Sequence, residues 1–181
     1  MQRVIEAIPS LPRGRWLEPS AGDGAIMRAV NSCRRPHYWT AVELREECRA
    51  PLRAIGADVT IADFIALAPA WARTGTGFSV AILNPPFSLS LQFIAACLPI
   101  AEHTVALLRL NWLEGQERNG FLRDHAPDVY VLPVRPSFTG GGTDATAYAW
   151  FHWQRGARRS HGRIEVLSVA PAAQLSLLGG T

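Results

Sequence analysis

The stretch ILNPPFSLS (residues 82–90) ends an apolar run with an asparagine, two prolines and a phenylalanine. Proline has no backbone N–H and a fixed φ, and the residue before a proline is pushed toward extended conformations. The side-chain oxygen of Asn84 and the main-chain oxygen of Pro85 are therefore two hydrogen-bond acceptors in a stiff turn, with the ring of Phe87 beyond them. A simple turn at the end of a strand is the alternative, because Asn-Pro pairs commonly begin turns.

A pair of acceptors in this arrangement can bind both hydrogens of a planar amino group. Binding both hydrogens draws the nitrogen lone pair out of conjugation and directs it toward an electrophile, which is electrostatic preorganisation at the reacting atom. An aromatic side chain beyond the acceptors can stack on the ring that carries the amino group. The candidate catalytic residues are Asn84, Pro85, Pro86 and Phe87.

The composition is that of one folded domain. The chain has 181 residues, of which 48% are apolar and 18% charged, which suits a single core and is too apolar for a disordered chain. No segment approaches the roughly 20 apolar residues that span a bilayer. The N-terminal residues also lack the pattern of a signal peptide, so we expect a cytoplasmic protein without membrane contact. The cysteines Cys33, Cys48 and Cys97 lie far apart with no histidines at metal-binding spacing, and we expect neither a disulfide nor a metal site.

Apolar runs of strand length alternate with helical patterns through the first two thirds of the chain. The strand-like runs are residues 15–20, 38–44, 58–64, 78–84 and 103–110, and the helical patterns are residues 25–32, 45–55 and 89–98. This alternation predicts an α/β fold with a parallel sheet covered by helices. Two later runs, 129–133 and 146–153, predict an antiparallel hairpin at the edge of the sheet.

Ligands of open α/β sheets bind beyond the carboxyl ends of the strands, so the residues after each strand identify the candidate site. After the first strand, Gly22 and Gly24 permit a tight turn and the close approach of a ligand to the backbone. Met27 stands where the dinucleotide fingerprint has its third glycine, which disfavours NAD and FAD. A plain strand-to-helix turn is the alternative interpretation of these glycines.

Acidic residues follow the next two strands. Glu43 lies about 20 residues beyond the glycines, where a carboxylate can accept hydrogen bonds from both ribose hydroxyls. Asp63 can accept a hydrogen bond from an adenine amino group, and Phe64 can pack on the adenine ring. Each acidic residue alone is also compatible with a helix cap or a solvated charge, but together the strand ends describe a slot for an adenosine.

These motifs, in this order, resemble the class I S-adenosylmethionine-dependent methyltransferases. More narrowly, they resemble the N6-adenine amino-methyltransferases of DNA, including small phage-borne and orphan members. The resemblance runs from about residue 15 to about residue 153, and its most specific motif is NPPF at residues 84–87. It implies a Rossmann-like fold with a mostly parallel seven-stranded sheet and an antiparallel edge hairpin. Residues 1–162 would form the methyltransferase domain and residues 163–181 a short extension and tail.

The resemblance also implies a cofactor and residues that bind it. S-adenosylmethionine would bind at the ends of the first four strands, with its methionine part on the glycine loop, its ribose at Glu43 and its adenine beside Asp63 and Phe64. The cofactor-binding residues would be Glu18, Pro19, Ala21, Gly22, Asp23, Gly24, Glu43, Leu44, Asp63, Phe64 and Asn84. Asn84 and Pro85 would orient the target amine.

The target would be an adenine flipped out of duplex DNA or present in a single strand. Phe87 would stack on one face of the base, and Phe138 is expected on the other face. The net charge of +3 comes from arginine alone, because the sequence contains no lysine. Candidate contacts to phosphates are Arg118, Arg123, Arg135, Arg155, Arg158 and Arg159, with a solvated surface cluster as the alternative. The spacing leaves no room for a separate recognition domain, so we expect short or relaxed sequence specificity.

Three other functions share these motifs. The same chemistry could act on adenine in RNA or on the side-chain amide of a protein glutamine, and an inactive nucleic-acid-binding module of the same fold is a further alternative. The tail AQLSLL (residues 173–178) resembles the peptides with which bacterial DNA enzymes bind the replication sliding clamp, so Gln174 to Leu178 are a candidate clamp-binding segment.

Overall fold

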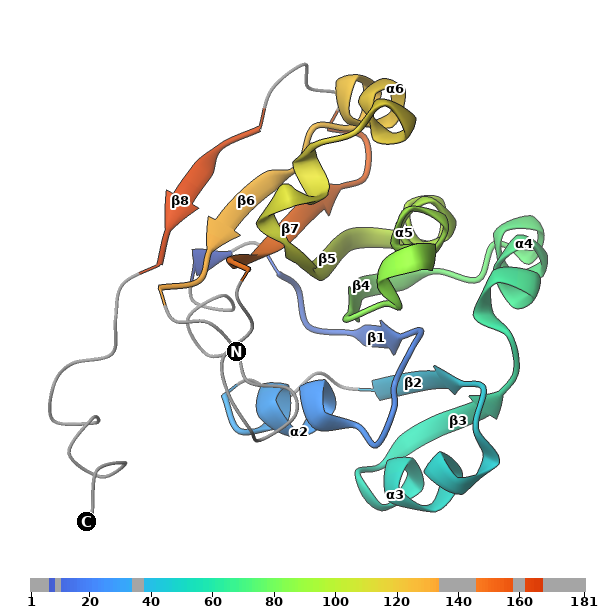
Figure 1. The fold of residues 1–181 in the computed structure, drawn as a ribbon. Coiled ribbons are helices and arrows are strands. Elements are labelled where there is room, and N and C mark those ends of the chain that lie inside the picture. The colour runs from blue at the N-terminus through green and yellow to red at the C-terminus, as the bar shows by residue number, and fades with distance from the viewer. Residues whose placement is uncertain (1–6, 9–10, 34–37, 134–145, 158–161, 168–181) are drawn as a thin grey trace, which may run out of the picture.

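The computed structural model describes residues 7–8, 11–33, 38–133, 146–157 and 162–167, and Figure 1 shows how the elements are arranged. The strands are β1 (Arg15–Glu18), β2 (Tyr38–Glu43), β3 (Ala57–Ile61), β4 (Phe78–Leu83), β5 (Ala101–Arg109), β6 (Asp128–Val131), β7 (Tyr148–Gln154) and β8 (Ile164–Val166). The α-helices are α2 (Ala25–Asn31), α3 (Arg49–Ala54), α4 (Phe64–Thr74), α5 (Ser90–Cys97) and α6 (Gln116–Asp124). Short 3₁₀ turns are η1 (Glu46–Cys48), η2 (Phe87–Leu89) and η3 (Leu110–Leu113).

The strands form one sheet in the order β3-β2-β1-β4-β5-β7-β6-β8. Strands β1 to β5 are mutually parallel, and β7 pairs antiparallel with both β5 and β6. The predicted α/β fold with its antiparallel edge pair is therefore confirmed. The sheet has eight strands where seven were predicted, because Ile164–Val166 pair in parallel with β6 as a short edge strand.

Helices cover both faces of the sheet (Figure 1). On one face, Met27 and Val30 of α2 and Leu52 of α3 pack against side chains of the central strands. On the other face, α4 and α5 supply a second buried cluster that includes Phe64 and Phe93. Burial on both faces explains why the strands are nearly continuous apolar runs rather than alternating ones.

Two helices were missing from the sequence interpretation. Helix α4 begins at the cap residue Asp63, whose Oδ1 accepts the Ile65 N–H at 2.8 Å, and it ends at Gly75 with φ of 72°. Pro69 lies inside it, and a proline at that position weakens the helical pattern in the sequence. Helix α6 has no buried residue, so it lacks the continuous apolar stripe that would have revealed it. Among the described residues, no helix is long and apolar enough to cross a membrane.

The sheet order places a topological switch point between β1 and β4. From β1 the chain crosses to β2 on one side, whereas β4 pairs with β1 on the other side. In open parallel sheets a crevice forms at the carboxyl ends of such strands and binds ligands. The glycine loop follows β1 and the Asn-Pro-Pro-Phe turn follows β4, so the two motifs lie side by side at the carboxyl edge of the sheet.

Two histidines lie buried where the parallel and antiparallel parts of the sheet join. Nδ1 of His103 on β5 is 2.9 Å from Nε2 of His152 on β7, and their rings are stacked with an interplanar angle of 7°. One of the two facing nitrogens must lack a proton for this hydrogen bond to form. Burial lowers the pKa of His103, and the nearby negative charge of Glu102 opposes that effect without overcoming it.

This pair predicts that the fold is destabilised by mild acid. A histidine whose folded pKa lies below the unfolded value of about 6.5 contributes stability above that pH and loses it as the pH falls through the folded pKa. We expect the free energy of unfolding to be flat above pH ~7 and to fall as the pH drops below ~6.5. Urea denaturation of His103→Phe should show a weaker pH dependence than wild type. An equal pH dependence in the two proteins would contradict this role.

Candidate active site

The Asn-Pro-Pro-Phe turn leaves both of its expected acceptors available. Asn84 is half-buried directly after β4, Pro85 is buried, and Phe87 is 48% exposed. Within the described part of the chain, no hydrogen bond engages the Asn84 side chain or the Pro85 carbonyl. The Asn84 carbonyl accepts a hydrogen bond of 3.4 Å from the hydroxyl of Ser20, which ties this turn to the loop after β1.

Buried hydrogen bonds hold the backbone behind Phe87. The Ser90 hydroxyl donates to the Phe87 carbonyl at 2.9 Å and accepts from Trp112 Nε1 at 2.8 Å. Ser90 and Trp112 are both buried, so leaving any of these groups unpaired would cost about 1–3 kcal/mol. The turn is therefore fixed by the two prolines that precede Phe87 and by the hydrogen bonds of Ser90 that follow it.

The ring of Phe87 contacts two residues that sequence reasoning missed. The guanidinium carbon of Arg109 lies 4.4 Å from the Phe87 ring centroid, and the Tyr148 ring centroid lies 6.3 Å away. Arg109 Nε also donates to the Tyr148 hydroxyl at 3.2 Å. Arg109 is the last residue of β5, so the same inspection of strand ends that identified Glu43 could have found it. Tyr148 carried no comparable signal, because it begins its strand.

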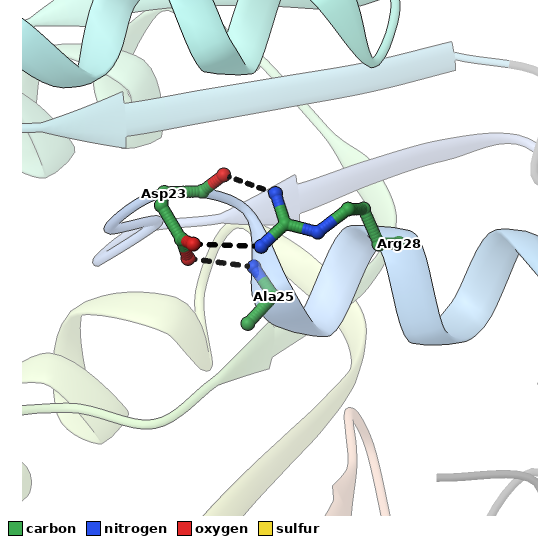
Figure 2. A network of polar contacts seen from close by, with 3 residues as sticks. All are labelled: Asp23, Ala25 and Arg28. Carbon is green, nitrogen blue, oxygen red and sulfur yellow. Dashed lines mark hydrogen bonds and ion pairs between the residues drawn. The ribbon is translucent and has the colours of Figure 1, made fainter. Parts of the chain in front are cut away.

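The loop after β1 has the backbone that its glycines predicted. Gly22 and Gly24 have φ of 55° and 87°, in the left-handed region that favours glycine. A Cβ on Gly24 would also meet the end of the Ile55 side chain, which would have to shift. Figure 2 shows how Asp23 braces the turn: its carboxylate accepts from Ala25 N–H at 3.2 Å and from Arg28 at 2.7 Å.

Glu43 is bonded to the same loop. Its Oε2 accepts the Gly22 N–H at 2.7 Å, and its Oε1 accepts the backbone N–H and the Nε of Arg45 at 3.1 and 3.0 Å. Burial alone would raise the pKa of Glu43, but the hydrogen bonds from Arg45 and Gly22 outweigh it and keep the pKa below its ordinary value. The carboxylate predicted to bind a ribose is thus ionised, and an exposed arginine occupies one of its oxygens.

Glu18 ends β1 directly beneath the glycine loop. It is 2% exposed, and its Oε2 has no hydrogen-bond partner in the described structure. Burial raises the pKa of Glu18 well above its ordinary value, although a hydrogen bond from the Met27 backbone N–H lowers it in part. An unpaired buried acceptor is costly unless a ligand supplies the missing donor.

The predicted adenine contacts are separated by the structure. Phe64 is 2% exposed and packs on Phe93 with ring centroids 5.4 Å apart, so it belongs to the core rather than to the rim. Its placement at the start of α4 turns its side chain toward Phe93 of α5 and away from the rim where it was predicted to pack on an adenine ring. Asp63 remains exposed at the rim, where it caps α4, and Leu44 is 69% exposed beside Glu43.

The predicted phosphate-binding arginines lie away from the turn or outside the described residues. Arg118 donates to the carbonyls of Trp112 and Glu114, so it braces η3. Arg155 donates to the Pro99 carbonyl and follows β7, whose end pairs with the start of β5 at the opposite edge of the sheet. Arg123 is exposed in the last turn of α6. The predictions for Phe138, Arg135, Arg158, Arg159 and Gln174 to Leu178 concern residues outside the described ranges.

Known structures share this fold. No protein-family model and no curated protein matches the sequence. A protein from Pyrococcus horikoshii assigned as an RNA methyltransferase superposes with a TM-score of 0.62 and 11% identity, over 84% of this chain and 79% of that chain. A Listeria monocytogenes protein assigned as a class I S-adenosylmethionine-dependent methyltransferase superposes with a TM-score of 0.63 and 12% identity, over 97% of this chain and 66% of that chain. The 23S rRNA methyltransferase ErmE superposes with a TM-score of 0.60 and 17% identity, over 97% of this chain and 71% of that chain.

The chain therefore has the Rossmann-like fold of the class I S-adenosylmethionine-dependent methyltransferases. S-adenosylmethionine is the expected cofactor of this fold, and the residues present fit it. The unpaired Glu18 Oε2 can accept a hydrogen bond from a cationic ammonium, and the glycine loop leaves the backbone accessible. Glu43 and the exposed Leu44 stand at the next strand end, where a nucleoside would lie.

The burial of the Glu18 carboxyl predicts that this residue lowers the free energy of unfolding. Because its folded pKa is raised, Glu18 disfavours the folded state once the pH rises through that pKa. We expect Glu18→Gln to unfold with a free energy about 1–3 kcal/mol higher than wild type at pH ~8, and the gain to vanish near pH ~4.5. Urea denaturation at both pH values measures the difference in the free energy of unfolding. Asp58→Asn, at an exposed position, is the control. A destabilised Glu18→Gln at pH ~8 would contradict this account.

Proposed function

We propose that this protein is an S-adenosylmethionine-dependent methyltransferase that methylates the exocyclic N6 amine of adenine in DNA. The observation that carries the proposal is the Asn84-Pro85 turn, whose two acceptor oxygens have no hydrogen bond to any described residue and which lies at the end of β4 beside the loop after β1. Acceptors held in this way match a planar amino group that donates two hydrogen bonds. Phe87, about half exposed, is the aromatic surface for the base.

The chain's own residues activate the amine and need no covalent intermediate. The Asn84 amide oxygen and the Pro85 carbonyl accept the two N–H groups and direct the nitrogen lone pair toward the crevice. When bound, S-adenosylmethionine supplies an electrophilic methyl group on a sulfonium. Attack by the nitrogen would form the new N–C bond as the methyl C–S bond breaks and the neutral thioether leaves. The methylated ammonium would then lose its proton to water, so no strong base is required. Ser90 and Trp112 keep the turn in place, which spares reorganisation during the reaction.

Residues at three strand ends would hold the cofactor. Glu18 would bind the ammonium of its methionine part, the backbone from Ala21 to Gly24 would approach the same part, and Glu43 would bind the ribose. Asp63 retains one carboxylate oxygen with no hydrogen bond to a described residue, which leaves an acceptor for the adenine amino group. Leu44, which is 69% exposed, would supply an apolar contact to the adenine ring in place of the buried Phe64.

Adenine in RNA is the second candidate substrate. The same turn would bind the same amine, and two of the similar structures are described as RNA or rRNA methyltransferases. A duplex target must be flipped out of its stack to reach the turn, whereas a single strand of either nucleic acid needs only to be unstacked. Incubation with labelled S-adenosylmethionine and DNA or RNA, followed by digestion and identification of the methylated nucleoside, separates the two.

Replacing Asn84 tests the proposed amine activation. We expect Asn84→Ala to lower the turnover number by about 10²-fold or more, because it removes one of two preorganised acceptors, with cofactor affinity within a few-fold of wild type. Asn119→Ala, at an exposed position of α6, serves as the matched control. If Asn84→Ala methylates nucleic acid at close to the wild-type rate, the assignment of Asn84 is wrong.

Replacing Arg45 tests the proposed role of Glu43. Arg45 Nε occupies the Glu43 Oε1 that a ribose hydroxyl would use, so the arginine and the cofactor compete for one acceptor. We expect Arg45→Ala to bind S-adenosylmethionine several-fold more tightly, as measured by calorimetry, while Glu43→Gln binds it more weakly. Arg49→Ala, which removes a surface ion pair with Glu46, should leave the affinity unchanged. Weaker cofactor binding by Arg45→Ala would show that Arg45 assists the cofactor instead.

A further inference from the structure

Strand β8 leaves one side of the sheet open. It is the last strand in the sheet order, and within the described ranges no strand pairs with its outer side (Figure 1). The Arg163 carbonyl and the Leu167 N–H both bond to β6, at 2.7 and 3.0 Å. Because alternate residues of a parallel strand bond to the same neighbour, Ile164 and Val166 direct their N–H and C=O groups outward. An edge of this kind is a template for a further strand.

The side chains of β8 add apolar surface to this edge. Ile164 is 67% exposed and Val166 is 70% exposed. They are the register partners of Val129 and Val131 of β6, so they lie on the same face of the sheet as these two residues, which pack in the cluster under α4 and α5. Exposed apolar side chains on an edge strand favour pairing with another chain, and proteins that avoid such pairing place charges or proline there.

An apolar hollow lies beside the start of β8 on this same face. It has a volume of about 170 Å³, and its lining includes Leu113, Leu122, Val129, Gly162 and Ile164. Gly162 leaves the hollow open toward the edge, and a Cβ at this position would collide with the Pro127 backbone. A strand placed outside Gly162 could therefore insert an apolar side chain over the glycine.

The charges on the other face of β8 determine which strand fits. Arg163 and Glu165 form an ion pair of 3.3 Å, and their side chains are 60% and 42% exposed. If a second copy of β8 pairs antiparallel about a twofold axis at Ile164, Arg163 of each copy lies opposite Glu165 of the other. Sliding by two residues keeps the outward N–H groups facing each other, but it sets Arg163 opposite Arg163 or Glu165 opposite Glu165. Like charges directly opposite each other destabilise a strand pair.

We propose that β8 is a homodimer interface, in which the β8 strands of two copies pair antiparallel and join the two sheets into one. Ile164 lies opposite Ile164 of the second copy and exchanges both backbone hydrogen bonds with it. Val166 of each copy lies opposite Gly162 of the other and covers the apolar hollow, while Arg163 and Glu165 form ion pairs between the copies.

One self-complementary strand supplies both halves of this interface, as a twofold axis requires. The contact area is small, so the dimer is weak and its population depends on protein concentration. This inference goes beyond the proposed methyltransferase function and does not depend on it.

The first experiment measures the mass of the protein by sedimentation velocity between about 1 and 100 μM, where we expect wild type to shift from monomer to dimer. Arg163→Glu and Glu165→Arg should each weaken the dimer about tenfold or more, because each sets like charges opposite one another twice. An equimolar mixture of the two variants should form a heterodimer, since every glutamate then meets an arginine. Arg49→Glu, which breaks the surface ion pair with Glu46, is the matched control and should dimerise as wild type does.

The second experiment tests the strand pairing and its register. Ile164→Pro removes an outward N–H that β6 does not use, so the variant should fold, with a thermal unfolding midpoint near that of wild type, and stay monomeric. In a background with the exposed Cys33 replaced by serine, Ile164→Cys should form a disulfide-linked dimer on mild oxidation. The opposed Cα atoms of such a pair are about 5.5 Å apart, which a disulfide can bridge. Val166→Cys should not cross-link, because its two copies would lie roughly 13 Å apart along the strands.

Each outcome bears on β8 itself. Wild type that remains monomeric at the highest concentration overturns the proposal. A dimer that Arg163→Glu leaves unchanged overturns it as well, because the contact must then lie on another surface. Charge variants that stay monomeric when mixed, or cross-linking through Val166→Cys in preference to Ile164→Cys, would exclude the register centred on Ile164. None of these measurements requires methylation activity, so failure of the proposed function would leave the result intact.

Discussion

Strands β1 to β5 are parallel and covered by helices on both faces, so their side chains must be apolar along almost their whole length. Polar side chains are most easily accommodated where the strands end, and because the strands are parallel their carboxyl ends all lie at one edge. Glu18, Glu43 and Asn84 follow or end three of these strands, and Arg109 ends a fourth. The candidate site is thus a consequence of strand direction, with residue type at each end deciding its chemistry.

The two glutamates at this edge have pKa values shifted in opposite directions by their surroundings. Glu43 receives three hydrogen bonds from Gly22 and Arg45, which keep it ionised despite partial burial. Glu18 is more deeply buried, has one unpaired oxygen and has a raised pKa. A fold selected for stability alone would not retain an unsatisfied carboxyl in this position, because an apolar or amide side chain would cost less. Within the described structure, this unpaired oxygen is the group that the proposed cofactor ammonium would satisfy.

The sequence predicted the parts of the structure that depend on local patterns. The five parallel strands, the edge pair, the left-handed glycines and the exposed Phe87 all follow from periodicity, turn chemistry or proline. The burial of Phe64 could not be predicted, because an aromatic residue at a strand end can point either to the rim or to the core, and only the start of α4 at that residue decides between them. The bonds of Arg118 and Arg155 to carbonyls could not be predicted either, because they depend on loops whose course no local pattern specifies.

The contacts between Phe87, Arg109 and Tyr148 show why an antiparallel strand matters in a mostly parallel sheet. In a parallel sheet only the last residues of strands reach the ligand-binding edge, and the first residues lie at the opposite edge. Because β7 runs antiparallel to β5, its first residue, Tyr148, lies beside the last residue of β5, Arg109. The strand therefore brings a buried hydroxyl to an edge otherwise built from strand ends, and this hydroxyl holds the guanidinium over Phe87. Trp112, three residues after Arg109, bonds through Ser90 to the Phe87 backbone, so the arginine and the ring are fixed by the same short segment. A shift of the β5–β7 register by one residue would put the Tyr148 side chain on the opposite face of the sheet from Arg109, so this contact depends on the register.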